Sequence, residues 1–437
     1  MLYLEAAALS SQRQAFTRLV AHELQHLLHS YIDPTEDTWV NEGLSEVISH
    51  LVVPSPRPTP SNGLLKLSLT RWPDHSVDLG GYYTTANLFF RYITNRYRDT
   101  QGLSKLIARP EDGIDGVDAF LDEVGRGEDF ATVFQDWATA NLLGGDGLTG
   151  YPYEEDPALR SVTPSNLIKT GDSWEGSVVP FAVDYGRLEL PSGSHTLWFD
   201  GQVTNTILPT KPYSGVSCWW SNRGDSTHTR LSRKIDLSRL TEATLRFRAW
   251  YNLEKSWDFL YVTASQDGGV TWDILPGTYT VADNPVGINY GQGFTGQSDG
   301  WIQETIDLTP YTGASVLLAF EQVSDDATNL DGACLDDIEV PEISLFDDVE
   351  TDSPWNAEGF VRTEMTIPQT FGVRIVITKG NGTVSVEGID LDEENNGSIK
   401  INVAAEGVQS ATVIVSSLTR YTSQPATYKL SLDNRLH

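Results

Sequence analysis

The chain has 437 residues, enough for two to four domains, and 39% of them are hydrophobic with 10% aromatic. This composition excludes a largely disordered protein. The 30 Lys and Arg residues face 60 Asp and Glu residues, and the resulting net charge of −30 argues against nucleic acid or an anionic membrane as a partner. No apolar run reaches the roughly 18 residues that a membrane-spanning helix needs.

Residues 16–29 form the first predicted helix, because the segment contains few helix-breaking residues. It includes the sequence His22-Glu23-Leu24-Gln25-His26. Residues four apart lie one turn apart on nearly the same helix face, so His22 and His26 can both direct an imidazole nitrogen at one Zn²⁺. Glu23 would lie beside the open coordination position and act as general base on an attacking water. The alternative is a surface helix with solvated histidines.

A second helix is predicted from about residue 38 to residue 51, after Pro34 ends the first helix. Glu42 and Glu46 are four residues apart and therefore share one face of it. A zinc site with two histidines needs a third protein ligand, and Glu42 is the candidate. Glu46 is expected to accept a hydrogen bond from the second ring nitrogen of one of the two histidines, which would set its tautomer.

These two motifs resemble those of the gluzincin metallopeptidases, in which HExxH is followed by NExxS-D/E. HELQH at 22–26, WVNEGLSE at 39–46 and FQDWATAN at 134–141 are most similar to hyicolysin-type and immune-inhibitor-A-type secreted bacterial peptidases. The fifteen residues between the second histidine and the glutamate are few for this clan and leave room only for a tight turn. The resemblance implies a zinc peptidase in which His22, His26 and Glu42 are ligands, Glu23 is the base and Glu46 supports the ligands.

Other candidate groups surround this core. His29 is a competing ligand, but it lies about 10 Å along the helix axis from the first histidine, so we interpret it as a helix-end residue near the cleft. Peptide hydrolysis passes through an oxyanion that a Tyr or His can stabilise. Tyr82 and Tyr83, at the start of a third helix predicted over 80–97, are the candidate donors, with His75 as a weaker one. The alternative is that both tyrosine rings only pack.

The first residues of the chain carry a separate expectation. Residues 1–7 are typical of the middle of a strand, and they do not have the pattern of a signal peptide. Peptidases of the resembled type carry a signal, a propeptide and a β-rich lobe before the catalytic helices. We therefore expect an N-terminally truncated form of a secreted protein.

The remainder of the chain is predicted to be β-rich. A Gly-, Pro- and acid-rich break over 144–157 ends the helical region, and short alternating strands with turn signals follow. Residues 208–342 resemble the jelly-roll domain of immune-inhibitor-A-type peptidases, and strands before it can pair with the C-terminal strands. The expected fold is multidomain α+β, with a mainly helical gluzincin-like catalytic region at 1–145, a β segment at 158–207, the jelly roll at 208–342 and a C-terminal β domain at 343–437.

Jelly rolls of this type often hold a structural Ca²⁺, an ion that takes six to eight oxygen ligands. Asp258 and Asp336 are the preferred pair, and the alternative is that such acids are solvated loop residues. Cys218 and Cys334 lie 116 residues apart, and they either form a disulfide or are two buried thiols. The candidate calcium ligands are Glu254, Asp258, Asp336 and Asp337.

Two functions are consistent with the sequence. The first is a secreted zinc endopeptidase that acts on protein or peptide substrates, with Zn²⁺ and possible Ca²⁺ as cofactors. The second is an extracellular binding or adhesion protein, whose β domains recognise a polymer or carbohydrate and whose peptidase part is inactive. The intact HExxH sequence with Glu42 and Glu46 favours the first, since an inactive remnant need not retain all of these residues.

Overall fold

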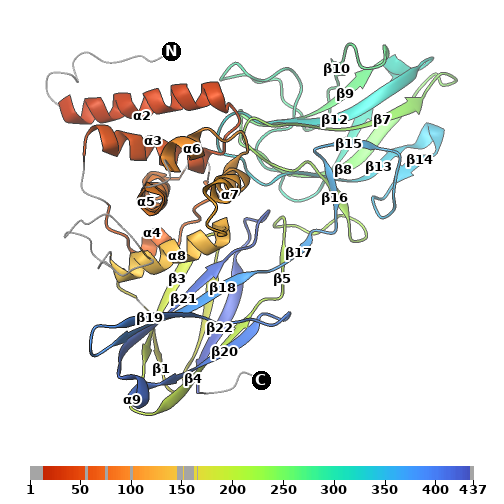
Figure 1. Cartoon of the computed structure of the whole chain (residues 1–437). Coiled ribbons are helices and arrows are strands. Elements are labelled where there is room, and N and C mark those ends of the chain that lie inside the picture. Colours follow the sequence, from red (N-terminus) through yellow and green to blue (C-terminus); the bar gives the residue numbers. More distant parts are fainter. Residues whose placement is uncertain are drawn as a thin grey trace. The chain divides into compact units, whose positions relative to one another are not determined.

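The computed structural model forms two compact units (Figure 1). The first comprises Met1–Trp72, Asp78–Asn205 and Ile367–His437, and the second comprises Pro73–Val77 and Thr206–Thr366. The expected strand at 1–7, His75 and most of the expected break at 144–157 lie outside the described residues. The structure describes residues 13–54, 58–73, 77–98, 102–144, 151, 162–164 and 166–433.

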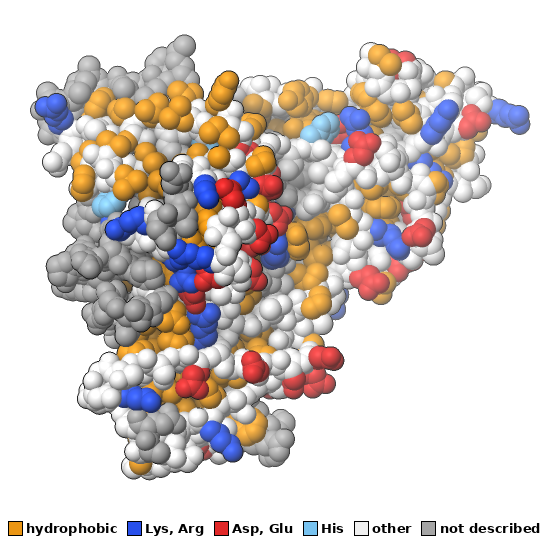
Figure 2. All heavy atoms as spheres, in the orientation of Figure 1, with side chains coloured by type: hydrophobic (Ala, Val, Ile, Leu, Met, Phe, Trp, Pro, Cys, Tyr) orange, Lys and Arg blue, Asp and Glu red, His pale blue; other side chains and the backbone are white. Residues whose placement is uncertain are grey.

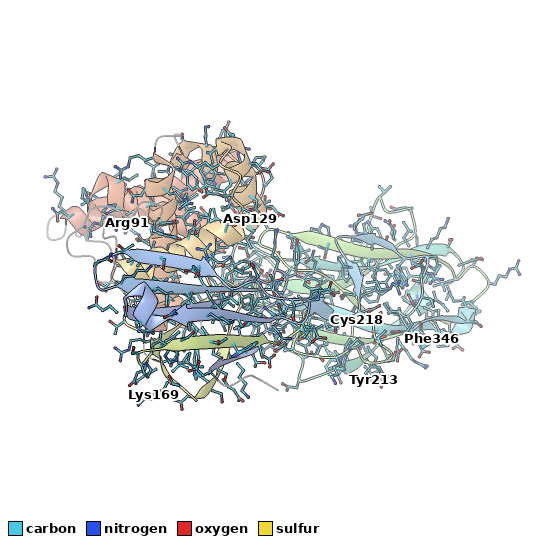
Figure 3. The ribbon with its side chains drawn as sticks, turned by 60° about the horizontal axis from the view of Figure 1, so that its bottom comes forward. Arg91, Asp129, Lys169, Tyr213, Cys218 and Phe346 are labelled. Atoms are coloured by element: carbon cyan, nitrogen blue, oxygen red, sulfur yellow. A yellow bond between two sulfur atoms is a disulfide. The ribbon has the colours of Figure 1, made fainter. Side chains whose placement is uncertain are left out.

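The first unit begins with the helices that the sequence predicts, and their packed faces are strongly aromatic. Trp39, Phe89, Phe90 and Phe130 are buried together, with ring centroids 5.3–6.1 Å apart. Asp129 (labelled in Figure 3) caps the start of the helix Phe130–Leu143, because its side chain accepts a hydrogen bond from Thr132 N–H at 2.8 Å. The helices are α2 (Arg13–Ile32), α3 (Thr38–Val52), α4 (Asn62–Leu65), α5 (Gly80–Arg96), α6 (Gly102–Ile107), α7 (Gly113–Val124) and α8 (Phe130–Leu143).

A β-sandwich completes the first unit. One sheet has the order β1-β3-β21-β18-β19 and the other β2-β22-β4-β20. Both sheets therefore combine strands from before residue 206 with strands from after residue 366, so neither segment could form this sandwich alone. The elements are β1 (Asn166–Lys169), β2 (Ser173–Val178), β3 (Val183–Glu189), β4 (Ser194–Gly201), β18 (Phe371–Lys379), β19 (Val384–Gly388), β20 (Asn396–Asn402), α9 (Val403–Glu406), β21 (Val408–Ser417) and β22 (Ala426–Leu432).

The helices of this unit pack directly on the sandwich. α8 lies over β3, β21 and β18 (Figure 1), and Tyr185 donates its hydroxyl hydrogen to the Ala138 carbonyl at 2.8 Å. Asp136 of α8 accepts hydrogen bonds from Arg374 of β18 at 2.6 Å and from Arg96 of α5 at 2.9 Å. Because this carboxylate is mostly buried, the two guanidinium groups offset the cost of removing it from water. The helical part and the sandwich thus form one structural unit.

The second unit is a jelly roll of two antiparallel sheets, with orders β10-β9-β12-β7-β15 and β11-β8-β13-β6-β16. Residues 345–363, which the sequence analysis assigned to the C-terminal domain, add β14, β15 and β16 to this unit. Strands of three residues are too short to show an alternating pattern, so periodicity could not assign them. The strands are β6 (Cys218–Trp220), β7 (His228–Asp236), β8 (Thr244–Asn252), β9 (Phe259–Ser265), β10 (Asp273–Ile274), β11 (Ile302–Asp307), β12 (Ser315–Val323), β13 (Gly332–Val340), β14 (Leu345–Asp347), β15 (Asn356–Glu358) and β16 (Val361–Thr363), and β5 (Thr204–Thr206) pairs with β17 (Thr366–Pro368).

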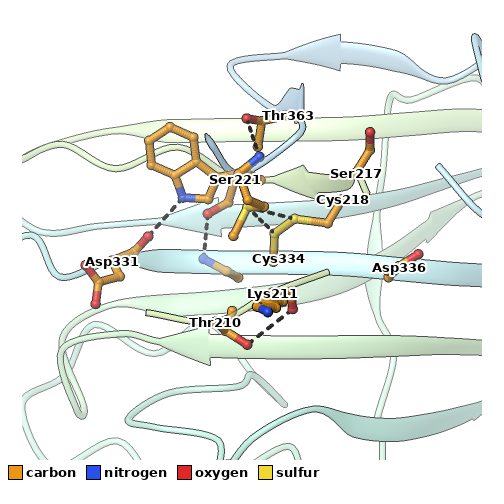
Figure 4. The surroundings of a disulfide bond; sticks show 12 residues. Thr210, Lys211, Ser217, Cys218, Ser221, Asp331, Cys334, Asp336 and Thr363 are labelled. Carbon is orange, nitrogen blue, oxygen red and sulfur yellow. Dashed lines mark hydrogen bonds between the residues drawn. A yellow bond between two sulfur atoms is a disulfide. The ribbon is translucent and has the colours of Figure 1, made fainter. Parts of the chain in front are cut away.

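Cys218 and Cys334 form a disulfide (Figure 4), with their Cα atoms 5.9 Å apart. The two cysteines meet because β6 and β13 are neighbouring strands. The bond closes a loop of 116 residues. A loop of that size contributes about 4–5 kcal/mol in the chain-entropy account of disulfide stability.

None of the helices that the structure describes has both the length and the apolar character needed to cross a membrane.

Replacing Arg374 by Met should destabilise the first unit by about 2 kcal/mol, since Asp136 would lose one of its two charged hydrogen-bond donors. The free energy of unfolding, measured in urea, tests this. Arg187→Met on strand β3 of the same sheet is the control, because that side chain is exposed. Equal losses in the two variants would contradict a role for the Arg374–Asp136 pair.

Candidate metal centre

α2 and α3 form an antiparallel pair joined by the short loop Asp33–Asp37. Asp33 stabilises the turn, because its Oδ1 accepts hydrogen bonds from the backbone N–H and the hydroxyl of Thr35 at 3.1 and 3.0 Å. Across the pair, Ser45 Oγ donates to Gln25 Oε1 in the buried interface. This tight turn places the HExxH turn of α2 against the first two turns of α3.

Three side-chain atoms converge where these helices meet. His22 Nε2 lies 3.0 Å from His26 Nε2 and 3.1 Å from Glu42 Oε2. The third distance, between His26 Nε2 and Glu42 Oε2, is 3.3 Å. Four-coordinate zinc with ligands at 2.0–2.1 Å separates its ligand atoms by about 3.3 Å. Within the described residues, this is the one group of three His, Cys, Asp or Glu side chains whose ligand atoms lie within 4.8 Å of one another.

The outer nitrogens of both histidines face hydrogen-bond acceptors. Glu46 Oε1 lies 3.4 Å from His22 Nδ1, and Asn41 Oδ1 lies 3.0 Å from His26 Nδ1. Each acceptor favours the tautomer with hydrogen on Nδ1, which leaves the Nε2 lone pair directed at the centre of the trio. The structure places Glu46, the predicted partner of a ligand histidine, beside His22. Sequence reasoning did not assign a role to Asn41, although the residue directly precedes Glu42 in the quoted motif.

Tyr83, but not Tyr82, reaches the trio. The Tyr83 hydroxyl donates to Glu42 Oε1 at 3.0 Å. Both rings pack on Trp72, with centroid separations of 5.9 Å for Tyr82 and 4.9 Å for Tyr83. Tyr82 is part of the apolar packing around the helical core, so the packing alternative describes its position.

The charged groups of this cluster act strongly on one another's pKa values. Burial alone would lower the pKa of His22, but the carboxylates of Glu42 and Glu46 outweigh it and raise the pKa to about 9. Burial alone would raise the pKa of Glu42, but His22 and His26 lower it to about 2. Burial and then the charge of Glu42 raise the pKa of Tyr83, and Glu23 adds to this effect. Glu23 is half-buried, and its charge acts on the same tyrosine that contacts Glu42.

His29 lies outside the trio. Its side chain is buried, and burial lowers its pKa, so it is neutral in this interface. The ring continues the packed face of α2 toward the loop and is not one of the three converging ligands.

The four candidate calcium ligands form two separate groups. Glu254 and Asp258 share the turn before β9, where Asp258 N–H donates to the Glu254 carbonyl at 2.9 Å. Asp336 instead accepts from Ser214 N–H at 3.0 Å, and Asp337 accepts from the Ser214 hydroxyl at 2.8 Å. On β13, Asp336 lies four residues beyond the position that pairs with the end of β8, or about 13 Å along the strand. The preferred pair of Asp258 and Asp336 is therefore not assembled, and we propose no calcium site.

The outward face of α2 is apolar and exposed. Leu24, Leu27, Leu28 and Tyr31 are 46–91% exposed, and hydrophobic side chains follow this helix in Figure 2. They lie on the side of the helix opposite the histidines, at the spacing of one helix face. This face does not contribute to the metal-ligand trio.

Residues 201–365 match the family model described as Immune inhibitor A-like, MAM domain. The match covers the jelly roll and not the helices that carry the trio. It agrees with the resemblance stated for this part of the sequence.

Parts of the chain are similar to three further proteins, two of which are named as peptidases. It is 32% identical over 155 residues to the pre-pro-metalloprotease PrtV of Vibrio cholerae, covering 35% of this chain and 16% of that protein. It is 28% identical over 284 residues to Immune inhibitor A of Bacillus thuringiensis, covering 58% and 39%. It is 29% identical over 94 residues to Bacillopeptidase F of Bacillus subtilis, covering 22% and 5%. The chain thus spans less than half of each relative, and the similarity supports a relationship to peptidases at a coarse level.

Glu36, in the loop between the two ligand helices, has an unusual environment. Its Oε1 accepts hydrogen bonds from Gly113 N–H and Asp37 N–H, both at 2.8 Å, and the side chain is buried. Burial, with the charges of Asp37 and Asp33, raises the pKa of Glu36 to about 9 in spite of those hydrogen bonds. The carboxyl group is therefore neutral at pH 7 in the folded protein.

This raised pKa predicts a pH-dependent loss of stability. The folded protein retains a proton on Glu36 that the unfolded chain releases above its ordinary pKa of 4.5, so stability falls as pH rises from about 4.5 to 9. Glu36→Gln removes this ionisation and should lose less unfolding free energy than the parent between pH 5 and pH 9. Urea unfolding at both pH values measures this, with the exposed Glu111→Gln as control. Parallel pH curves for Glu36→Gln and the parent would contradict the prediction.

Proposed function

We propose that this chain is a zinc-dependent metallopeptidase of the gluzincin type, acting on peptide bonds of protein or peptide substrates. The observation that carries the proposal is the convergence of His22 Nε2, His26 Nε2 and Glu42 Oε2 within 3.0–3.3 Å of one another. The similarity to metalloproteases supports it independently, since PrtV is named as one. Because the aligned part is a minority of each relative, the activity and the substrates are proposals for this chain.

The residues present fit a zinc ion. Glu42 Oε2 is a buried oxygen without a hydrogen-bond partner, and two imidazole nitrogens face it. Two nitrogens and one carboxylate oxygen with a fourth open position are the donor set of catalytic zinc sites. A zinc ion held by this trio would polarise the substrate carbonyl and lower the pKa of a water molecule toward about 7.

The chain's own residues then have distinct roles. Glu23 would accept the proton of the attacking water and deliver it to the leaving amine. Asn41 and Glu46 hold the two imidazoles with Nε2 directed inward. Tyr83 contacts the carboxylate that completes the trio, and its hydroxyl would donate to an oxyanion once substrate is bound.

We also propose an extracellular location. The disulfide between Cys218 and Cys334 forms stably in oxidising compartments. The net charge of −30 suits a protein that remains in solution, because it disfavours binding to an anionic membrane. The alternative, a binding protein with an inactive peptidase part, is distinguished by the two experiments that follow.

Elemental analysis of the purified chain should find one zinc ion per molecule. Glu42→Ala should lose most of it, because two imidazoles alone do not complete the site. Glu111→Ala, which removes an exposed carboxylate elsewhere in the same unit, should retain the ion. A folded parent without zinc would contradict the proposed centre.

Glu23→Gln should retain the zinc and lose nearly all hydrolysis, by a factor of about 10² or more, because general acid–base catalysis contributes roughly that much. Release of peptides from casein, with zinc content determined on the same samples, separates the two effects. Glu111→Gln is the control of equal charge change. If Glu23→Gln cleaved casein as fast as the parent, Glu23 would not be the base.

A further inference from the structure

α3 and α5 are joined by three polar contacts at a constant spacing. The hydrogen-bonded partners are 41 residues apart in each case, and successive contacts advance by four residues on both helices. The two helices therefore run parallel in a fixed register, with one contact per turn. From the N-terminal end, these contacts, here called the α3–α5 ladder, are Glu42 with Tyr83, Glu46 with Asn87, and His50 with Arg91.

Each contact of the ladder has its donor on α5 and its acceptor on α3. Tyr83 donates its hydroxyl hydrogen to Glu42 Oε1 at 3.0 Å, and Asn87 donates from Nδ2 to Glu46 Oε2 at 3.4 Å. At the third contact the Arg91 guanidinium (Figure 3) lies 2.9 Å from an imidazole nitrogen. Because arginine only donates, that imidazole accepts with a lone pair.

The ladder divides the two oxygens of each glutamate between neighbouring helices. Glu42 uses Oε1 for Tyr83 and leaves Oε2 for the histidines of α2. Glu46 uses Oε2 for Asn87 and leaves Oε1 facing His22 Nδ1. A carboxylate held at one oxygen cannot rotate freely, so α5 determines where the other oxygen lies.

From this division we infer that Asn87 is a positioning residue of the metal centre, acting on His22 through Glu46. The inference rests on the proposed zinc site. Asn87 is 5% exposed, whereas the Glu46 side chain is 35% exposed and could turn toward water without a partner. Asn87 would therefore hold Glu46 in the orientation that sets the His22 tautomer, a role that the sequence motif does not reveal.

Removing this contact should weaken metal binding without preventing folding. Loss of a hydrogen bond behind a metal-ligating histidine typically reduces metal affinity by about 10–100-fold. Asn87→Leu removes the donor at nearly constant volume, and we expect a reduction of about tenfold. Asn87→Asp places a second carboxylate against Glu46 and should reduce affinity further.

The test uses the full chain and zinc affinity measured by competition with a chelator. Asn95→Leu is the matched control, since Asn95 lies two turns further along α5, where its side chain bonds to the Arg91 backbone carbonyl and to the Arg98 guanidinium and, among the described residues, to no residue of α3. Absorption spectra of the Co²⁺-loaded proteins report on ligand geometry, and the spectrum should change in both Asn87 variants but not in the control. Neither readout requires a substrate.

A double-mutant cycle separates positioning from a general structural effect. If Asn87 acts through Glu46, Asn87→Leu should have little further effect on zinc affinity in a Glu46→Gln background. Additive losses, or an Asn87→Leu affinity equal to that of Asn95→Leu, would overturn the inference while the zinc site stands. A parent chain that binds no zinc would overturn the proposed function, and this inference with it.

Discussion

The position of α3 between α2 and α5 is the constraint on which the candidate centre depends. α2 supplies two imidazoles, but their nitrogens form a site only if a carboxylate reaches them from a second helix. Glu42 meets this need with one oxygen, while its other oxygen is hydrogen-bonded to Tyr83 of α5. Glu46 repeats the arrangement one turn later. The acid groups of α3 are thus oriented from both sides, and such fixed orientation is what a metal centre requires.

Concentrating this much charge in a half-buried space has a cost that the neighbours offset. The carboxylates stabilise the charged form of His22, and the imidazoles stabilise the charged form of Glu42, so that in spite of burial the pKa of His22 rises to about 9 and that of Glu42 falls to about 2. A divalent cation would replace the proton in this arrangement. The aromatic core behind Trp39 keeps the helices fixed while the polar face remains accessible.

The helices also depend on a β-sandwich that is assembled from two distant parts of the chain. Asp136 links α8 to Arg374 of β18 and to Arg96 of α5, the helix that carries the ladder donors. The jelly roll is inserted in sequence between the two halves of this sandwich. The similarity to the Immune inhibitor A-like, MAM domain therefore falls on the inserted unit, whereas the candidate metal centre of His22, His26 and Glu42 belongs to the interrupted one.

The sequence alone determined the features that depend on local periodicity. The four-residue spacings of His22 with His26 and of Glu42 with Glu46 define helix faces, and Pro34 defines the turn, so the helices and the side chains of the trio were predictable. What only the tertiary structure decided involves partners far apart in the chain. Asn87 belongs to the centre because α5 runs parallel to α3 in one register, and Asp258 is separated from Asp336 by the pairing of β13 with β8. A spacing pattern carries no information on which helix or strand packs beside another, because that choice follows from the burial of whole faces.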